Sequence, residues 1–158
     1  MNQPSPPIQD TLDLLVGKRA WGLTRTHGSM FFLEIGDPLH RKGGKKVHGQ
    51  WHFLVLMCHW RVELPGSLLV GSDDSPKWID DTFSGTELGM VEKINVIPPS
   101  HDLLIVFSSG LRLTTFGASA TAKDDWTQWN FYCPNDDVWV LDAGGDLLVR
   151  NGNVPPPG

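Results

Sequence analysis

The chain has 158 residues, a mass of 17.5 kDa and 40% hydrophobic residues, which is the size of one domain with a single core. A net charge of −5 with 20% charged residues excludes a self-repelling disordered chain and disfavours a nucleic-acid binder, which needs Lys and Arg to neutralise phosphates. The sequence has no apolar run of about 18 residues and no basic or apolar segment typical of a secretory signal at its start, so it predicts a cytoplasmic protein without a membrane span.

The two ends of the sequence are predicted to be tails. Residues 1–7 contain three prolines, and residues 151–158 are equally rich in proline and glycine. The interpretation is therefore a single globular domain over residues 8–150. Its first element is a short helix over 8–15, because Ile8, Leu12 and Leu15 fall on one helical face and Gly17 follows them.

The pattern turns extended after residue 19. Residues 19–26 and 29–35 alternate around a His-Gly turn and predict a hairpin. Residues 37–48 combine proline and glycines with four bases and predict an exposed loop. Residues 50–63 predict one long strand that is apolar on both faces in its middle, with Trp51, Leu54 and Leu56 buried together with Phe53 and Val55.

A second helix is predicted over 76–83, where Ser75 suits the N-cap and Pro76 the first helical position. Trp78, Ile79 and Phe83 are expected on its buried face. Further strands are predicted at 67–70, 89–97, 102–108, 110–116, 126–133, 137–142 and 146–150. The fold class is therefore α+β, mostly antiparallel β, with about nine strands in a curled or barrel-like meander and one or two short helices.

Spacing argues against metal and catalytic sites. Cys58 and Cys133 lie in apolar runs and are expected to be reduced core thiols. His52 is six residues from Cys58 and four from His48, which in a regular strand means about 20 Å and about 13 Å, too far for one ion to join either pair without a sharp bulge. We therefore expect no metal and no stoichiometric zinc in the purified protein.

Other catalytic signatures are also missing from the sequence. The serines beside glycine never form GxSxG, and the basic segment 41–46 leads into a strand instead of a helix, so it predicts a solvated loop and not a phosphate-binding loop. The sequence predicts no cofactor and no catalytic residue, and it favours a protein without enzymatic activity.

Acidic residues are concentrated in the later part of the chain. Residues 49–158 carry fourteen acids and six bases, a balance of −8, whereas residues 1–48 carry +3. Four acidic pairs recur beside turns or helix starts, where carboxylates commonly cap helices and stabilise turns. The alternative is a recognition patch for a basic protein. The candidate patch consists of Asp73, Asp74, Asp80, Asp81, Asp124, Asp125, Asp136 and Asp137.

A second candidate site lies at the end of the long strand. His59, Arg61 and Glu63 share one face and, with Trp60, are the candidate floor of a small polar pocket. The alternative is that these side chains are solvated or paired with one another where the strand leaves the core. Of the seven tryptophans, four are expected in the core, and three are candidates for a pocket or interface rim. The core group is Trp51, Trp78, Trp129 and Trp139, and the rim group is Trp21, Trp60 and Trp126.

Several segments together resemble small bacterial domains of unassigned function, some of which are similar to immunity proteins of polymorphic toxin systems. The resemblance covers residues 14–150 and is carried by strand patterns at 15–22, 28–34, 49–53, 58–62 and 129–141. It implies a compact α+β domain and assigns no functional residue.

The leading hypothesis is a non-enzymatic protein-binding module, an immunity-type inhibitor of a basic toxin domain, acting as a monomer or homodimer without nucleic acid or membrane. The alternative is a small-ligand-binding or enzymatic β-barrel with its pocket near His59, Trp60 and Arg61.

Overall fold

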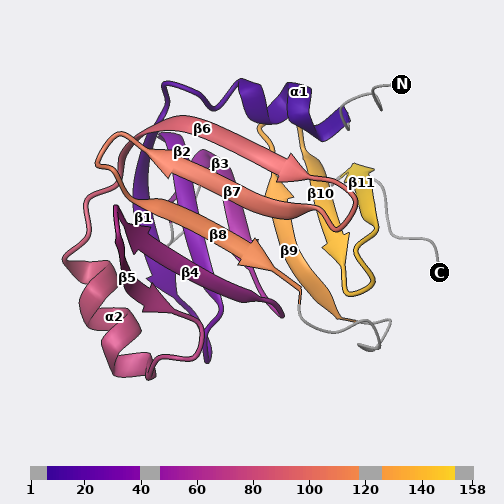
Figure 1. Ribbon diagram of the computed structural model, residues 1–158. Coiled ribbons are helices and arrows are strands. Elements are labelled where there is room, and N and C mark those ends of the chain that lie inside the picture. Colours follow the sequence, from indigo (N-terminus) through magenta and orange to yellow (C-terminus); the bar gives the residue numbers. More distant parts are fainter. Residues whose placement is uncertain (1–6, 40–46, 118–125, 152–158) are drawn as a thin grey trace.

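The computed structural model describes residues 7–39, 47–117 and 126–151, which form eleven strands and two helices (Figure 1). The helices are α1 (Pro7–Asp13) and α2 (Pro76–Ser84). The strands are β1 (Arg19–Arg25), β2 (Phe31–Leu39), β3 (His48–Val55), β4 (His59–Leu64), β5 (Ser67–Gly71), β6 (Gly89–Ile97), β7 (Asp102–Phe107), β8 (Arg112–Phe116), β9 (Thr127–Tyr132), β10 (Asp137–Asp142) and β11 (Leu147–Asn151).

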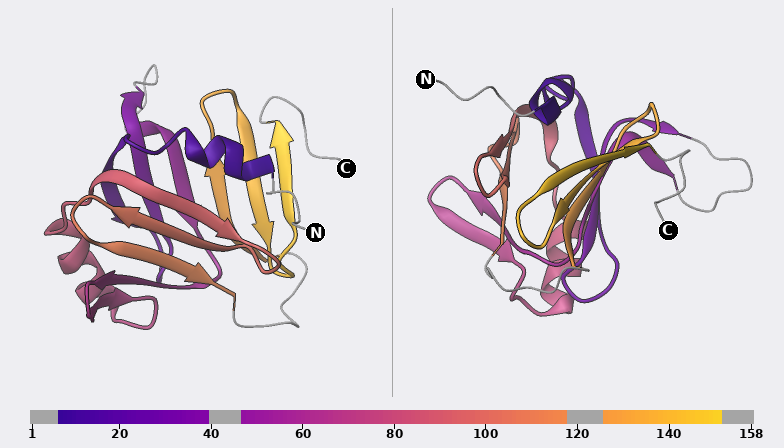
Figure 2. Two further views of the ribbon diagram at one scale, coloured as in Figure 1. Left: turned by 45° about the horizontal axis from the view of Figure 1, so that its top comes forward. Right: turned by 90° about the vertical axis from the view of Figure 1, so that its right-hand side faces the viewer.

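The strands form one open antiparallel sheet in the order β11-β10-β9-β3-β2-β1-β6-β7-β8-β4-β5. We call β11-β10-β9-β3-β2-β1 the first arm and β6-β7-β8-β4-β5 the second arm. The arms meet where Arg19 and Ala20 of β1 pair with Met90 and Gly89 of β6. Figure 2 shows that the sheet folds over at this junction, so that the two arms face each other as two layers.

The core fills the space between the arms. Alternate residues of β3 are buried, as a strand with one face on a core requires. Phe53 is fully buried, stacks on Phe131 with ring centroids 4.4 Å apart and meets the edge of Trp129 at 5.8 Å. Of the five residues expected to be buried along this stretch, Trp51, Phe53 and Val55 are buried, whereas Leu54 and Leu56 on the opposite face are half-buried.

The predicted fold class is confirmed: the described residues are mostly antiparallel β with two short helices. Sequential pairing holds within β1-β2-β3, β4-β5, β6-β7-β8 and β9-β10-β11, whereas β1 pairs with β6, β3 with β9 and β4 with β8. The tails predicted at 1–7 and 151–158 and the basic segment 41–46 lie outside the described residues, apart from Pro7 in α1 and Asn151 in β11.

The single strand predicted over 50–63 is wrong, because the chain leaves β3 after Val55 and begins β4 at His59 in the other arm. The amides of Leu56 and Met57 still donate to Gln128 and Thr127, and Cys58 packs against the core. Residues 56–58, which connect the two arms, are therefore as apolar as a strand and contain no glycine or proline that would indicate a break.

Both predicted helices are present. α2 begins as expected, with Ser75 Oγ accepting the Trp78 amide at 3.2 Å and with Ile79 and Phe83 buried. Two of the tryptophan predictions are wrong. Trp78 is half exposed, whereas Trp60 is buried against Phe31 and donates its indole N–H to the Ser29 carbonyl at 2.8 Å.

Candidate functional site

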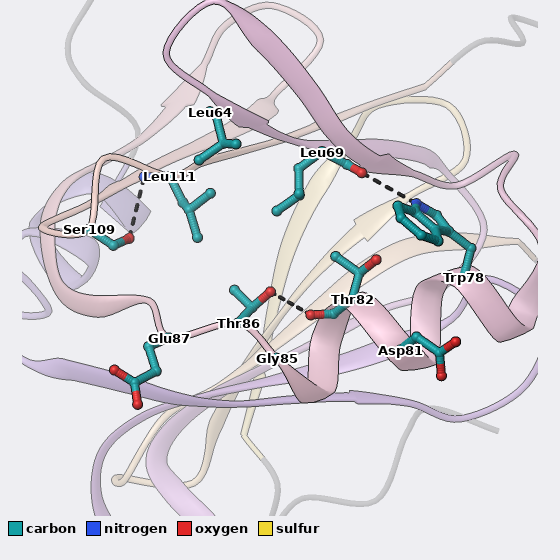
Figure 3. Close-up of a pocket in the computed structure, with 10 residues that line it drawn as sticks. All are labelled: Leu64, Leu69, Trp78, Asp81, Thr82, Gly85, Thr86, Glu87, Ser109 and Leu111. Atoms are coloured by element: carbon teal, nitrogen blue, oxygen red, sulfur yellow. Dashed lines mark hydrogen bonds between the residues drawn. The ribbon is translucent and has the colours of Figure 1, made fainter.

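A pocket of about 510 Å³ lies beside α2, and we call it the α2 pocket (Figure 3). It is bounded by α2 and the residues after it, by β4 and β5, and by the turn between β7 and β8. Its lining residues are Leu64, Leu69, Trp78, Asp81, Thr82, Gly85, Thr86, Glu87, Ser109 and Leu111. Figure 3 shows Leu64, Leu69 and Leu111 pointing into one space above Thr82 and Thr86.

Trp78 borders this pocket and is fixed by a hydrogen bond. Its indole Nε1 donates to the Leu69 carbonyl of β5 at 3.4 Å, while half of the residue stays exposed. Leu64 and Leu68 on the β4–β5 hairpin are exposed as well. An apolar patch with a positioned tryptophan is typical of an anchor site for a partner side chain.

Acidic residues are concentrated on α2 and just beside it, and two of them, Asp81 and Glu87, line the α2 pocket. Residues 72–87 contain five acids and one lysine, a balance of −4. Lys77 Nζ pairs with Asp81 at 2.6 Å, and this contact raises the pKa of the lysine. Asp73, Asp74 and Glu87 are exposed. The rim therefore presents negative charge beside the leucines.

Asp80 is not a free surface charge. Its two carboxylate oxygens accept from Nε and Nη2 of Arg25 at 2.7 and 2.9 Å, which ties α2 to β1. The hydrogen bond from Arg25 holds the pKa of Asp80 below its ordinary value. A lysine at position 80 would face Arg25, so reversing this charge would weaken the contact between α2 and β1.

The four acidic pairs do not form a single patch. Asp73, Asp74, Asp80 and Asp81 lie on α2 or just before it. Asp136 and Asp137 lie at the turn between β9 and β10, at the opposite end of the molecule from α2 (Figure 1). Asp124 and Asp125 lie outside the described residues.

Trp60 does not line the predicted pocket at His59, Arg61 and Glu63, because its side chain is buried in the core. Nε of Arg61 pairs with Glu63 at 2.5 Å, and its guanidinium lies over the Phe116 ring. His59 stacks on the same ring at 5.7 Å. The alternative interpretation, side chains paired with one another at the surface, is confirmed for Arg61 and Glu63.

A cluster that the sequence did not predict lies on the outer face of the first arm: Glu34, His48 and His52. Nδ1 of His48 lies 2.7 Å from Oε1 of Glu34, and the Gly49 amide donates to Oε2 at 2.8 Å. The rings of His48 and His52 stack at 4.4 Å, and His52 stacks in turn on Tyr132 at 4.4 Å. One potential ligand atom from each of the three cluster residues lies within 4.8 Å of the others.

Two bulges build this cluster. In β2, Gly36 and Asp37 stand opposite the single residue Gln50 of β3, and in β1, Trp21 is inserted where Ala20 and Gly22 pair with Ile35 and Glu34. Bulges bend strands and raise their twist. The ring centroids of His48 and His52 lie 4.4 Å apart, so the backbone spacing of about 13 Å expected for a regular strand does not keep the two side chains apart.

Glycines make room for the cluster at two positions. A Cβ on Gly22 would lie 2.7 Å from Cγ of Glu34, and one on Gly49 would lie 2.5 Å from the Ile35 carbonyl oxygen. Gly36 adopts a φ of 87°, which favours glycine. These glycines in neighbouring strands were the signal in the sequence that could have revealed a bulged site.

The cluster opens into a second pocket, of about 280 Å³, between β3 and the β9–β10 turn. His48 and His52 line it together with Tyr132, Cys133 and Asp137. Burial raises the pKa of the Cys133 thiol to about 12, as it does for Cys58, so neither thiol is a ready nucleophile near neutral pH. Both cysteines are free and packed against the core, as expected.

No family model, no curated protein and no solved structure matches this chain. Among the described residues, neither helix is long and apolar enough to cross a membrane.

Proposed function

We propose that the protein is a non-enzymatic binding module that captures a basic protein partner at the α2 pocket. The observation that carries the proposal is the half-exposed Trp78, held by the Leu69 carbonyl at the mouth of an apolar pocket with an acidic rim. A partner segment with one apolar side chain flanked by lysine or arginine is complementary to this surface.

The apolar part of the surface would supply the affinity. Tryptophans that border desolvated pockets are frequent hot spots of protein interfaces. Leu64, Leu69 and Leu111 offer a space that fits a leucine- or phenylalanine-sized anchor, and Trp78 would cover its side. Because Trp78 is fixed on a helix, little side-chain entropy would be lost on binding.

The acidic part would supply the association rate. With Asp80 neutralised by Arg25, the other four acids of residues 72–87 exceed the one lysine by three, and this negative charge attracts a basic partner at long range. Salt screens the attraction. Inhibition of a basic toxin domain is the specific function that we propose, and the similarity to immunity proteins seen in the sequence accords with it.

Affinity capture with untagged variants tests the proposal. Immobilised wild-type protein is incubated with extract of the source cells, retained proteins are identified by mass spectrometry, and the purified partner is measured by surface plasmon resonance. We expect a basic partner whose association slows as salt rises. Trp78→Ala should weaken its binding by about 30-fold or more, the loss of a hot spot of about 2 kcal/mol.

Leu148→Ala is the matched control, because Leu148 is an equally exposed apolar residue on β11, which lies at the other edge of the sheet from β5. It should leave binding unchanged, and circular dichroism should show both variants folded. If a retained protein binds Trp78→Ala as tightly as wild type, the α2 pocket is not part of the interface. If the association rate does not change with salt concentration, the acidic rim does not contribute to binding.

A further inference from the structure

We propose that Glu34, His48 and His52 bind one divalent first-row transition ion of the Zn²⁺ class, a site separate from the α2 pocket. The three residues come from β2 and β3 on the outer face of the first arm, and one donor atom from each lies within 4.8 Å of the others. The proposal does not depend on the proposed protein partner.

The donor set selects the class of metal. Two imidazole nitrogens and one carboxylate oxygen suit Zn²⁺ and its neighbours, whereas Mg²⁺ and Ca²⁺ prefer sets made of oxygen alone. Three protein ligands leave at least one position open for water or for a partner's donor. The pocket of about 280 Å³ over His48 and His52 has room for that additional ligand.

Small movements would convert the present contacts into coordination. Ligands about 2.1 Å from a tetrahedral ion lie about 3.4 Å from each other. The 2.7 Å contact between Glu34 and His48 would open slightly, and His52 would move closer. The ion would take the place of the proton between Nδ1 of His48 and Oε1 of Glu34, and in a neutral ring that proton would move to Nε2.

The surroundings already hold the carboxylate in place. Glu34 is buried, and its second oxygen accepts the Gly49 amide at 2.8 Å, which leaves the first oxygen directed at His48. Outer hydrogen bonds of this kind orient metal ligands. A bound cation would add charge compensation to the contacts that the buried carboxylate already makes with His48 and Gly49.

The stack of His48, His52 and Tyr132 gives the site its own spectroscopic probe. The two imidazoles lie nearly parallel, with an interplanar angle of 18°, so at least one must turn for both lone pairs to reach one ion. That turn changes the stacking of His52 on Tyr132, which is the only tyrosine in the sequence. Tyrosine-labelled protein therefore gives a single set of ring signals in NMR spectra.

Metal-free, untagged full-length protein is titrated with Zn²⁺ and, separately, with Mg²⁺ in isothermal calorimetry and in NMR. We expect one Zn²⁺ per chain, no measurable Mg²⁺ binding, and a shift of the Tyr132 signals that saturates at one equivalent. The thermal midpoint of unfolding should rise with Zn²⁺, because the ion binds the folded chain.

Ring-preserving variants separate the ligand role from packing. His48→Phe and His52→Phe keep an aromatic ring in the stack but remove a donor, and each should weaken Zn²⁺ binding by about 100-fold or more, beyond the 10- to 100-fold typical of outer-sphere changes. Glu34→Gln keeps the acceptor for the Gly49 amide and removes the charge, and it should weaken binding as well.

His59→Phe is the matched control, because His59 is also a half-buried histidine stacked on an aromatic ring, but it lies on β4 in the second arm. It should bind Zn²⁺ like wild type. The proposal is overturned if wild type binds no Zn²⁺, if folded His48→Phe or His52→Phe binds it unchanged, or if the Tyr132 signals stay constant while zinc is bound.

Discussion

Nδ1 of His48 lies 2.7 Å from Oε1 of Glu34, although these residues are fourteen positions apart and a bulge separates them on paired strands. The contact joins the buried carboxylate of Glu34 to His48, which lines the pocket of about 280 Å³. Its geometry depends on backbone close approach at Gly49, and this dependence can be tested without any ligand.

Gly49→Ala should destabilise the protein by about 1–3 kcal/mol, the usual cost of forcing extra volume into a packed site. The added Cβ would lie 2.5 Å from the Ile35 carbonyl oxygen, and backbone cannot move aside as a flexible side chain can. Denaturant unfolding measures the change. Gly71→Ala is the control, because its Cβ would meet its nearest neighbour at 3.4 Å. Equal stability of the two variants would contradict the tight bulge.

The strands were predictable from the sequence because alternation along them reflects a core on one face. Phe53 and Val55 on one face of β3 show this, and so does the capping of α2 by Ser75. The pairing of β1 with β6 and of β3 with β9 could not be predicted from the sequence, because it depends on contacts between distant segments that leave no local pattern.

The candidate sites were less predictable than the strands. The cluster at Glu34 and His48 depends on bulges, and strand spacing assumes that there are none. Trp60 was expected at a rim and is buried, whereas Trp78 was expected in the core and is half exposed. A tryptophan in an apolar pattern fits both a core and an anchor surface, so the pattern could not distinguish them. The acidic residues around α2 were recognised, but the pairing of Asp80 with Arg25 spans 55 positions and is invisible in the sequence.

Phe53→Ala should destabilise the protein by about 3–5 kcal/mol, as aromatic truncations in cores do. Phe53 is fully buried and contacts Phe131 and Trp129, so the variant leaves a cavity in the middle of the core. Leu54→Ala, one position along on the opposite half-buried face, should cost less. A loss below about 1 kcal/mol for Phe53→Ala in denaturant unfolding would show that the core is wrongly placed.

Both cysteines should react slowly with iodoacetamide in the folded protein. Burial raises the pKa of Cys58 and of Cys133 to about 12, so the thiolate, which is the reactive form, is scarce at pH 8. Mass spectrometry of quenched samples measures the rate. Unfolding in urea should restore the rate of a free thiol, and rapid labelling of either cysteine in the native state would contradict its burial.

The pair of Arg25 and Asp80 should make stability depend on pH in the acid range. The contact lowers the pKa of Asp80 below its ordinary value of 3.8, so the folded state favours the ionised carboxylate. The resulting stabilisation is fully present above the unfolded value and is lost as pH falls through the lower folded value. Wild type should therefore exceed Asp80→Asn in free energy of unfolding at pH 7, and the difference should shrink as the pH falls below about 4.

Asp81→Asn is the control, because Asp81 pairs with Lys77 on the surface of the same helix and does not tie α2 to another element. The difference between wild type and Asp81→Asn should be smaller at pH 7, since exposed pairs four residues apart on a helix contribute little. Urea unfolding at a series of pH values compares the three proteins. A constant gap between wild type and Asp80→Asn from pH 7 to pH 2 would show that the carboxylate charge does not hold α2 against β1.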